Sequence, residues 1–380
     1  MSRRRAREAG IVVGNGTPGP HNAITDVSGV RVGHVTLIDG AGPLRVGQGP
    51  VRTGVTVVVP HSGNVYAAPL YAGVHWLNGN GELTGTAVVH EHGMLTSPIG
   101  LTNTGSVGVV RDAFTAIEVA DSGPGHIIWS LPVVGETWDG VLNDINGQHV
   151  RAEHTYQAYR GALAGPVAEG NVGAGTGVIC HGFKGGIGTA SRQLDAEDGS
   201  WTVGVLLQAN HGIRERLTIL GVPVGEIITD DVIPEPGPPE SSYPSRARSI
   251  IVLVATDAPL LPYQCTRLAR RAALGIARTG GAGEDDSGDG IFAFSTANLG
   301  VIPAKEQDNA AFRPVVLNDQ LIDPLFYAVI EATEEAIVNA LLVAETMQGR
   351  DGITAHALEE EALAEVLARF NRGPRTLMGW

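Results

Sequence analysis

The sequence predicts an α/β fold in which two packed β-sheets are covered by helices. Several apolar runs have strand length and no polar face, as expected for strands buried on both sides. A few longer stretches place their apolar residues at helical spacing. The 52 glycines and 22 prolines among 380 residues indicate tight turns rather than disorder, because apolar runs recur throughout the chain. No internal repeat of about 20–50 residues suggests a solenoid or a propeller.

Residues 11–60 alternate glycine turns with short valine-rich runs, which predicts strands rather than helices. His34 lies in one such run and is interpreted as a hydrogen-bonded structural residue. Four residues that follow resemble metal ligands: Glu82, His90, Glu91 and His92. A strand would place alternate side chains of the His-Glu-His segment on opposite faces, and the zinc-protease spacing is absent. We therefore expect no metal at this segment.

The polar turn at residues 101–106 precedes a predicted helix at about 106–120, whose apolar residues fall at helical spacing. Amides at the start of such a helix suit an anion or a developing oxyanion. A second helix is expected at about 153–164, where Pro166 limits its length.

Between these helices, residues 127–134 form an apolar run that predicts a buried strand. The run ends in Glu136, Trp138 and Asp139. Open α/β layers place functional groups at such strand exits, so these side chains are candidates for a site. A turn with solvated carboxylates is the alternative.

Residues 171–191 contain a Gly-x-Gly-x-Gly run that does not follow a strand and does not open a helix. The context of a dinucleotide-binding fingerprint is therefore missing, and the segment is interpreted as a glycine-rich sheet edge with Lys184 in solvent. The next predicted strand, at 202–212, carries Gln208 and Asn210 near its end. A side-chain amide at that place can donate to an oxyanion.

Residues 234–248 cannot form a helix or a central strand, because five prolines remove amide donors and fix φ. This segment is expected to be an exposed connector. At Ser249 the character changes, and residues 250–254 form a largely β-branched apolar run typical of a strand buried on both faces. A serine therefore begins a core strand directly after an accessible segment.

This junction suggests a specific chemistry. Cleavage of the Arg248–Ser249 bond would give Ser249 a free α-amino group, whose pKa is about 7.7–8.0. The neutral amine can then act as general base for the hydroxyl of the same residue, which is the arrangement of an N-terminal nucleophile. Serines also begin strands for purely structural reasons, so the junction alone leaves both interpretations open.

After this strand a helix is expected, with Thr256 or Asp257 as its N-cap. A glycine-rich loop then leads to another strand, with Ser287 and Asp289 at its entrance. Because they are two residues apart, both side chains can point the same way. Two further helices are expected, at 324–347 and 358–370.

Composition excludes some classes of function. A formal net charge of −14 and the lack of a basic stripe argue against a nucleic-acid surface. No apolar segment is long enough for a signal peptide or a membrane span. Cys180 and Cys265 form neither a disulfide framework nor a metal-ligand pattern. The sequence therefore predicts a cytoplasmic protein with reduced thiols.

Seven segments, in order along residues 19–375, carry a family resemblance: NAITDVSGVRVGH, PIGLTNTGSVG, ETWDGVLNDING, QANHG, RSIIVLVATDAPLLP, SGDGIFAFSTAN and ETMQGRDG. Together they resemble the L-aminopeptidase/D-amidase-esterase family, which includes the β-aminopeptidases. The resemblance implies a four-layered αββα sandwich of the self-processing, N-terminal-nucleophile kind. It also implies one domain, 1–380, cut into an α chain (1–248) and a β chain (249–380) at the end of a processing linker (234–248). Such chains typically assemble as homotetramers.

The resemblance also implies roles for individual residues. Ser249 corresponds to the nucleophile and the new N-terminus, and Asn210 to the oxyanion-hole asparagine. Ser287 and Asp289 correspond to the pair that orients the nucleophile. Glu136 corresponds to the acidic residue near the amino end of the substrate. The expected substrates are small peptides, amino-acid amides or esters, and neither a metal nor an organic cofactor is expected.

Three positions depart from the family pattern. Trp138 stands where some members have a tyrosine that assists the oxyanion hole, and an indole N–H can donate only one hydrogen bond. Asp289 is one methylene shorter than the usual glutamate, which is expected to loosen the orienting contact. Arg248 replaces the small or amide residue that commonly precedes the cleaved bond.

These observations favour a serine aminopeptidase, with two other classes as alternatives. A non-catalytic binding or scaffold protein would remain uncut, and the changes at Trp138 and Asp289 motivate that alternative. An acyltransferase of the ornithine-acetyltransferase type would share self-cleavage, but it normally exposes a threonine where this chain has Ser249.

Overall fold

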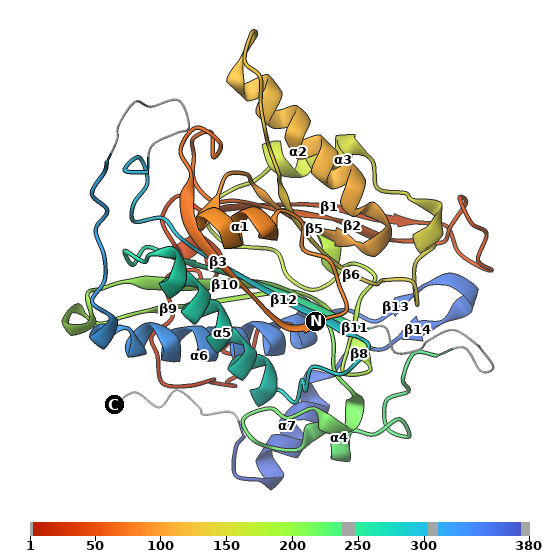
Figure 1. Ribbon diagram of the computed structural model, residues 1–380. Helices are drawn as coiled ribbons and strands as arrows, with labels where there is room; N and C mark the ends of the chain where they lie inside the picture. Colours follow the sequence, from red (N-terminus) through yellow and green to blue (C-terminus); the bar gives the residue numbers. More distant parts are fainter. Residues whose placement is uncertain (1–2, 238–247, 303–310, 374–380) are drawn as a thin grey trace.

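The chain folds into four layers, helix–sheet–sheet–helix, as Figure 1 shows. The computed structural model describes residues 3–237, 248–302 and 311–373. Most of the expected processing linker, residues 238–247, lies outside this described part. The prediction of a layered αββα sandwich is confirmed.

The larger sheet has the strand order β4-β3-β12-β11-β10-β9. Its central strands β11 and β12 run parallel, whereas the other neighbours are antiparallel. Its strands are β3 (Leu70–Gly79), β4 (Met94–Leu95), β9 (Gly186–Gln193), β10 (Thr202–Asn210), β11 (Arg248–Thr256) and β12 (Ser287–Ser295). Ser249 therefore lies at the beginning of a central strand, with a paired strand on each side.

The smaller sheet has the order β1-β2-β5-β6, in which only β5 and β6 are parallel. Its strands are β1 (Arg31–Asp39), β2 (Val51–Val59), β5 (Ile99–Asn103) and β6 (Val133–Thr137). Two short hairpins complete the strands described: β7 (Ile179–Cys180) with β8 (Phe183–Lys184), and β13 (Met347–Gln348) with β14 (Thr354–Ala355).

Helices cover the outer face of each sheet (Figure 1). α2 (Val107–Ser122) and α3 (Ala152–Arg160) pack on the smaller sheet, and α5 (Pro262–Arg278) and α6 (Asp323–Val343) pack on the larger one. The remaining helices are α1 (Thr86–His92), α4 (Val224–Ile227) and α7 (Glu360–Arg369). Among the described residues, none of these helices combines the length and apolar character needed to cross a membrane.

Strand β11 is apolar from Ile250 to Ala255, where both of its faces are buried. Ile250, Val252 and Val254 belong to the core that the larger sheet shares with its helices. Ile251 and Leu253 belong to the core between the two sheets. This division confirms the prediction made from the apolar run, and it fixes Ser249 at the end of a rigid element.

The segment that contains His90, Glu91 and His92 is helical, and the expectation of a strand there was wrong. These residues end α1, and all three are exposed. The helix is enclosed by Gly85 and Gly93, whose φ values of 72° and 69° suit glycine. The amide of Gly93 also donates to Val89 O at 2.8 Å, which ends the helix.

Two predicted element boundaries were also wrong. The strand expected at 127–134 begins only at Val133, because its partner β5 begins at Ile99, which pairs with Val133. Ile127 is 95% exposed. The helix expected after Thr256 begins at Pro262, because the carboxylate of Asp257 instead accepts a hydrogen bond from Thr202 N at 2.7 Å.

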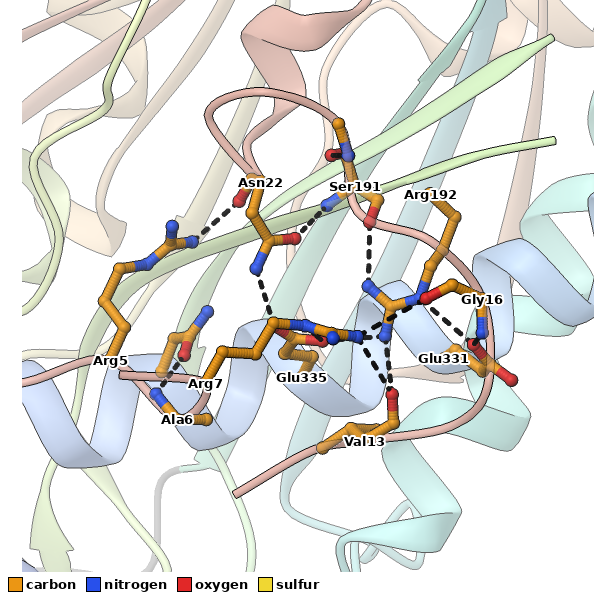
Figure 2. A network of polar contacts seen from close by, with 12 residues as sticks. Arg5, Ala6, Arg7, Val13, Gly16, Asn22, Ser191, Arg192, Glu331 and Glu335 are labelled. Carbon is orange, nitrogen blue, oxygen red and sulfur yellow. Dashed lines mark hydrogen bonds and ion pairs between the residues drawn. The ribbon is translucent and has the colours of Figure 1, made fainter. Parts of the chain in front are cut away.

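A buried charge network ties the N-terminal segment to α6, as Figure 2 shows. Glu335, which is fully buried, accepts hydrogen bonds from Arg7 Nε at 2.9 Å and from Arg192 Nη2 at 2.7 Å. Arg192 also contacts Glu331 at 3.0 Å and donates to Val13 O at 2.8 Å. The network therefore joins the N-terminus, β9 and α6.

We expect Glu335→Gln to lower the free energy of unfolding by about 2 kcal/mol, because it weakens charge-assisted hydrogen bonds to two guanidinium groups. Denaturant unfolding monitored by circular dichroism measures the change. Glu8→Gln, at an exposed position of the same N-terminal segment, is the matched control and should change stability by less than about 0.5 kcal/mol. Equal effects of the two substitutions would contradict the assignment of stability to the buried network.

Candidate active site

Ser249 is held between two neighbouring strands. In the β-sheet register it lies opposite Asn210 of β10 and Gly288 of β12. The residue is only 4% exposed. Its hydroxyl donates to Arg248 O at 2.5 Å, and the amide of Gly288 donates to Oγ at 3.3 Å. The hydroxyl is therefore held against the peptide bond that precedes it.

Ser287 and Asp289 lie on β12 beside Ser249. The parallel register pairs Ser287 with Arg248 and Asp289 with Ile250, so the two residues bracket Ser249 along the neighbouring strand. Ser287 Oγ donates to Asp289 Oδ1 at 2.6 Å, which confirms that both side chains point the same way. The shorter aspartate side chain thus reaches Ser287. Burial raises the pKa of Asp289 to about 6.

The side chain of Asn210 has a fixed orientation. Its Oδ1 accepts a hydrogen bond from Ile179 N at 2.8 Å, and its Nδ2 donates to Trp138 O at 3.1 Å. Asn210 is 4% exposed. The main-chain carbonyl of Trp138, rather than its indole, therefore makes this contact.

Glu136 lies on β6, at the other side of the site. Its Oε1 accepts from Glu82 N at 2.9 Å, and its Oε2 accepts from Thr104 Oγ1. A Cβ atom at Gly81 would lie 3.2 Å from Glu136 Oε1 and 3.0 Å from Gly288 Cα, so the carboxyl group lies near the strand that pairs with Ser249. Burial raises the pKa of Glu136.

A small cavity of about 60 Å³ lies at the Arg248–Ser249 junction. It is lined by Trp138, Asn210, Arg248 and Glu235, among others. Arg248 spans it by donating from Nε to Gly212 O at 3.2 Å and by pairing with Asp286 at 3.3 Å. Arg248, the residue before the candidate cleavage site, thus lies in this cavity.

A larger cavity of about 620 Å³ lies away from these groups, between α1, the loop after β2 and the segment before β6. Its lining includes Tyr66, Met94 and Trp129, and none of the candidate site residues. The larger cavity therefore does not coincide with the candidate site around Ser249.

The sequence did not establish the burial of two charged residues. Lys184 was expected in solvent but is fully buried, and its ammonium donates to Gly175 O, Val178 O and Gly185 O at 3.1, 3.0 and 2.8 Å. The sequence contains only two lysines, Lys184 and Lys305, and this rarity could have drawn attention to Lys184. Asp139 is 2% exposed, so the alternative of a solvated turn was wrong for it.

One group of side chains in the described residues has the composition of a metal site. The ligand atoms of Cys180, His181 and His211, all buried, lie within 4.8 Å of one another. The donor atoms of a tetrahedral zinc site are about 3.3–3.8 Å apart, as metal–ligand distances of about 2.0–2.3 Å require. Sequence spacing did not indicate this group, because its members are distant in the chain. Cys180 and His181 lie in the β7–β8 hairpin, whereas His211 directly follows β10.

Comparisons with known proteins agree with this geometry. Residues 22–355 match the family model described as Peptidase family S58. The chain is 47% identical to the beta-peptidyl aminopeptidase BapA of Sphingosinicella microcystinivorans, over 97% of this chain and 93% of that protein. Among solved structures, a Burkholderia sp. beta-aminopeptidase is 49% identical with a TM-score of 0.88, over 96% of this chain and 99% of that one.

A second solved structure adds the fold class. The L-aminopeptidase D-Ala-esterase/amidase from Ochrobactrum anthropi is 43% identical, with a TM-score of 0.88 over 97% of this chain and 99% of that one. It is described as a prototype of the serine aminopeptidases and as a variant of the N-terminal-nucleophile hydrolase fold.

Proposed function

The chain belongs to peptidase family S58 and is a serine aminopeptidase, and we propose that self-cleavage of the Arg248–Ser249 bond makes Ser249 its nucleophile. The observation that supports this assignment most is the position of Ser249. It is the second residue of the central strand β11, and its hydroxyl donates to Arg248 O at 2.5 Å. Residues 1–248 and 249–380 would then form the α and β chains of one domain.

Self-cleavage would proceed by an N→O acyl shift. Ser249 Oγ attacks the carbonyl carbon of Arg248, the C–N bond to Ser249 breaks, and the hydroxyl proton ends on the released nitrogen. Water then hydrolyses the resulting ester and frees the carboxylate of Arg248. The contact between Ser249 Oγ and Arg248, and the amide of Gly288 beside Oγ, support this step.

In turnover the new α-amine would act as general base. Its ordinary pKa of about 7.7–8.0 leaves a useful neutral fraction near neutrality. Ser287 and Asp289 bracket Ser249 along β12 and are the candidates for orienting this amine. Asn210, opposite Ser249, would donate to the oxyanion that forms when Oγ attacks the substrate.

The substrate would be a small peptide, amide or ester with a free amino terminus. Glu136 is the candidate partner of that ammonium group. Trp138 lines the cavity at the cleavage junction. The names of the relatives, beta-peptidyl aminopeptidase among them, favour peptides as substrates. By family resemblance the processed chains would form a homotetramer. The free thiols of Cys180 and Cys265 favour the cytoplasm.

We expect Glu136→Gln to raise KM for a substrate with a free amino terminus about 10- to 100-fold, because it removes a charge-assisted hydrogen bond. Steady-state hydrolysis of aminoacyl-p-nitroanilides measures the change. Glu82→Gln is the matched control, because its exposed side chain neighbours the site while only its main-chain amide contacts Glu136. An unchanged KM, or rapid hydrolysis of N-acetylated substrates by the parent enzyme, would contradict this role of Glu136.

A further inference from the structure

We propose that Lys184 is a positioning residue for the oxyanion-binding amide of Asn210 and acts through a single shared peptide group. The inference rests on the proposed role of Asn210. Lys184 is fully buried, although lysine is among the residue types that are almost never fully buried without partners. Its three acceptors are all main-chain carbonyls of residues 175–185, the segment that contacts Asn210.

The contacts form one continuous chain of hydrogen bonds. Lys184 Nζ donates to Val178 O at 3.0 Å. The same peptide group carries the N–H of Ile179, which donates to Asn210 Oδ1 at 2.8 Å. The amide of Asn210 in turn donates from Nδ2 to Trp138 O at 3.1 Å. We call the Lys184 ammonium, the Val178–Ile179 peptide group and the Asn210 amide the amide relay.

Every donor in the amide relay points in the same direction. A donor at the carbonyl of a peptide group withdraws electron density and makes the N–H of that group a stronger donor, so successive bonds polarise one another. Lys184 at the head of the relay therefore strengthens the Nδ2–H groups of Asn210 at its end. Lys184 also helps to fix the orientation of Asn210. It holds the Val178–Ile179 peptide group, and the N–H of Ile179 determines which way the side-chain oxygen of Asn210 points.

The other contacts of Lys184 hold the relay in place. Its bonds to Gly175 O and Gly185 O fix both ends of the segment that contains Ile179. Its main-chain amide donates to His356 O at 2.7 Å, which ties the hairpin to the region after β14. An arginine would not substitute, because its planar guanidinium cannot direct three N–H bonds from one atom as an ammonium does.

The protonation state of Lys184 sets how many carbonyl groups it can hold. Burial lowers the pKa of Lys184 to about 7, while the nearby Asp139 carboxylate opposes this shift. Burial also raises the pKa of Cys180 to about 12, so that thiol is neutral. Only the ammonium form can donate to all three carbonyl groups, because a neutral amine retains two N–H groups.

A double-mutant cycle separates this role from a structural one. The four full-length chains are the parent, Lys184→Met, Asn210→Ala and the double variant. Each is made by cell-free translation, and the first-order rate of β-chain release is followed after synthesis is stopped. We expect Lys184→Met to slow release about tenfold when Asn210 is present, and to change it less than twofold in the Asn210→Ala background.

Gln208→Met is the matched control. Gln208 is fully buried on β10, two residues before Asn210, and its Nε2 also donates to three acceptors: Thr102 O, Thr137 Oγ1 and Ala174 O. Because Gln208 lies outside the amide relay, Gln208→Met should change the rate of β-chain release by the same factor in the parent and in the Asn210→Ala chain. The proposal is wrong if Lys184→Met slows release by the same factor in both backgrounds. It is also wrong if Lys184→Met does not slow release when Asn210 is present.

Two further chains keep the outcome interpretable. If Lys184→Met shows no cooperative thermal transition, Lys184→Gln replaces it. That variant keeps two N–H donors, but in an uncharged side chain one atom shorter, so it removes the ammonium at the head of the amide relay and is judged by the same criterion. Ser249→Ala is included to test the proposed function separately. Release of the β chain from Ser249→Ala would overturn the nucleophile assignment, whereas the cycle alone decides the role of Lys184.

Discussion

Replacing Ser249 with alanine is expected to leave the chain in one piece and without aminopeptidase activity. The substitution removes the oxygen that lies against Arg248 O, so neither the acyl shift nor attack on a substrate can occur. Loss of the nucleophile in a serine protease lowers kcat about 10⁶-fold, and a comparable loss is expected here. Denaturing electrophoresis and hydrolysis of aminoacyl-p-nitroanilides measure the two effects.

Ser249→Cys is the matched control for this prediction, because it keeps a nucleophile of similar size at the same place. We expect it to retain at least slow self-cleavage, since a thiol can also take part in an acyl shift. A Ser249→Ala chain that is processed normally, or that retains substantial activity, would show that another residue is the nucleophile.

Replacing Asn210 with alanine is expected to lower kcat by roughly 10²–10³-fold while the protein remains folded. The amide of Asn210 lies opposite Ser249 in the sheet, and its orientation is fixed by Ile179 N–H and Trp138 O. Its removal takes away a donor whose bond strengthens as negative charge develops on the oxyanion. Self-cleavage should slow as well, because it passes through a similar tetrahedral intermediate.

Asn339→Ala serves as the control for the loss of a buried asparagine. Asn339 lies on α6, where its amide contacts Ala6 N and Thr189 O rather than the site. It should lower thermal stability without changing kcat. Comparable losses of kcat in the two variants would mean that Asn210 acts through stability and not through the oxyanion.

The position of Ser249 was predictable because the relevant signals are local. A proline-rich segment followed by an apolar run of strand length places a serine at the beginning of a strand, whatever the rest of the chain does. The pairing of Ser287 with Asp289 was predictable for the same reason, because alternate residues of a strand share a face. The family resemblance then supplied the roles that such local patterns leave open.

Other features depend on contacts between segments that are distant in the sequence. Strand register sets Asn210 opposite Ser249, and no pattern within either strand specifies that pairing. The burial of Lys184 depends on how residues 175–185 fold back over it. The strand expected at 127–134 failed for a similar reason, since its length is set by the start of β5 and not by its own apolar residues.

The most direct test of the account is the intact mass of the purified protein under denaturing conditions, with sequencing of every N-terminus. We expect two fragments that meet between Arg248 and Ser249, the smaller one beginning with Ser-Ile-Ile-Val. A single full-length mass from an active preparation, or a break at any other bond, would contradict the assignment of Ser249 as an N-terminal nucleophile.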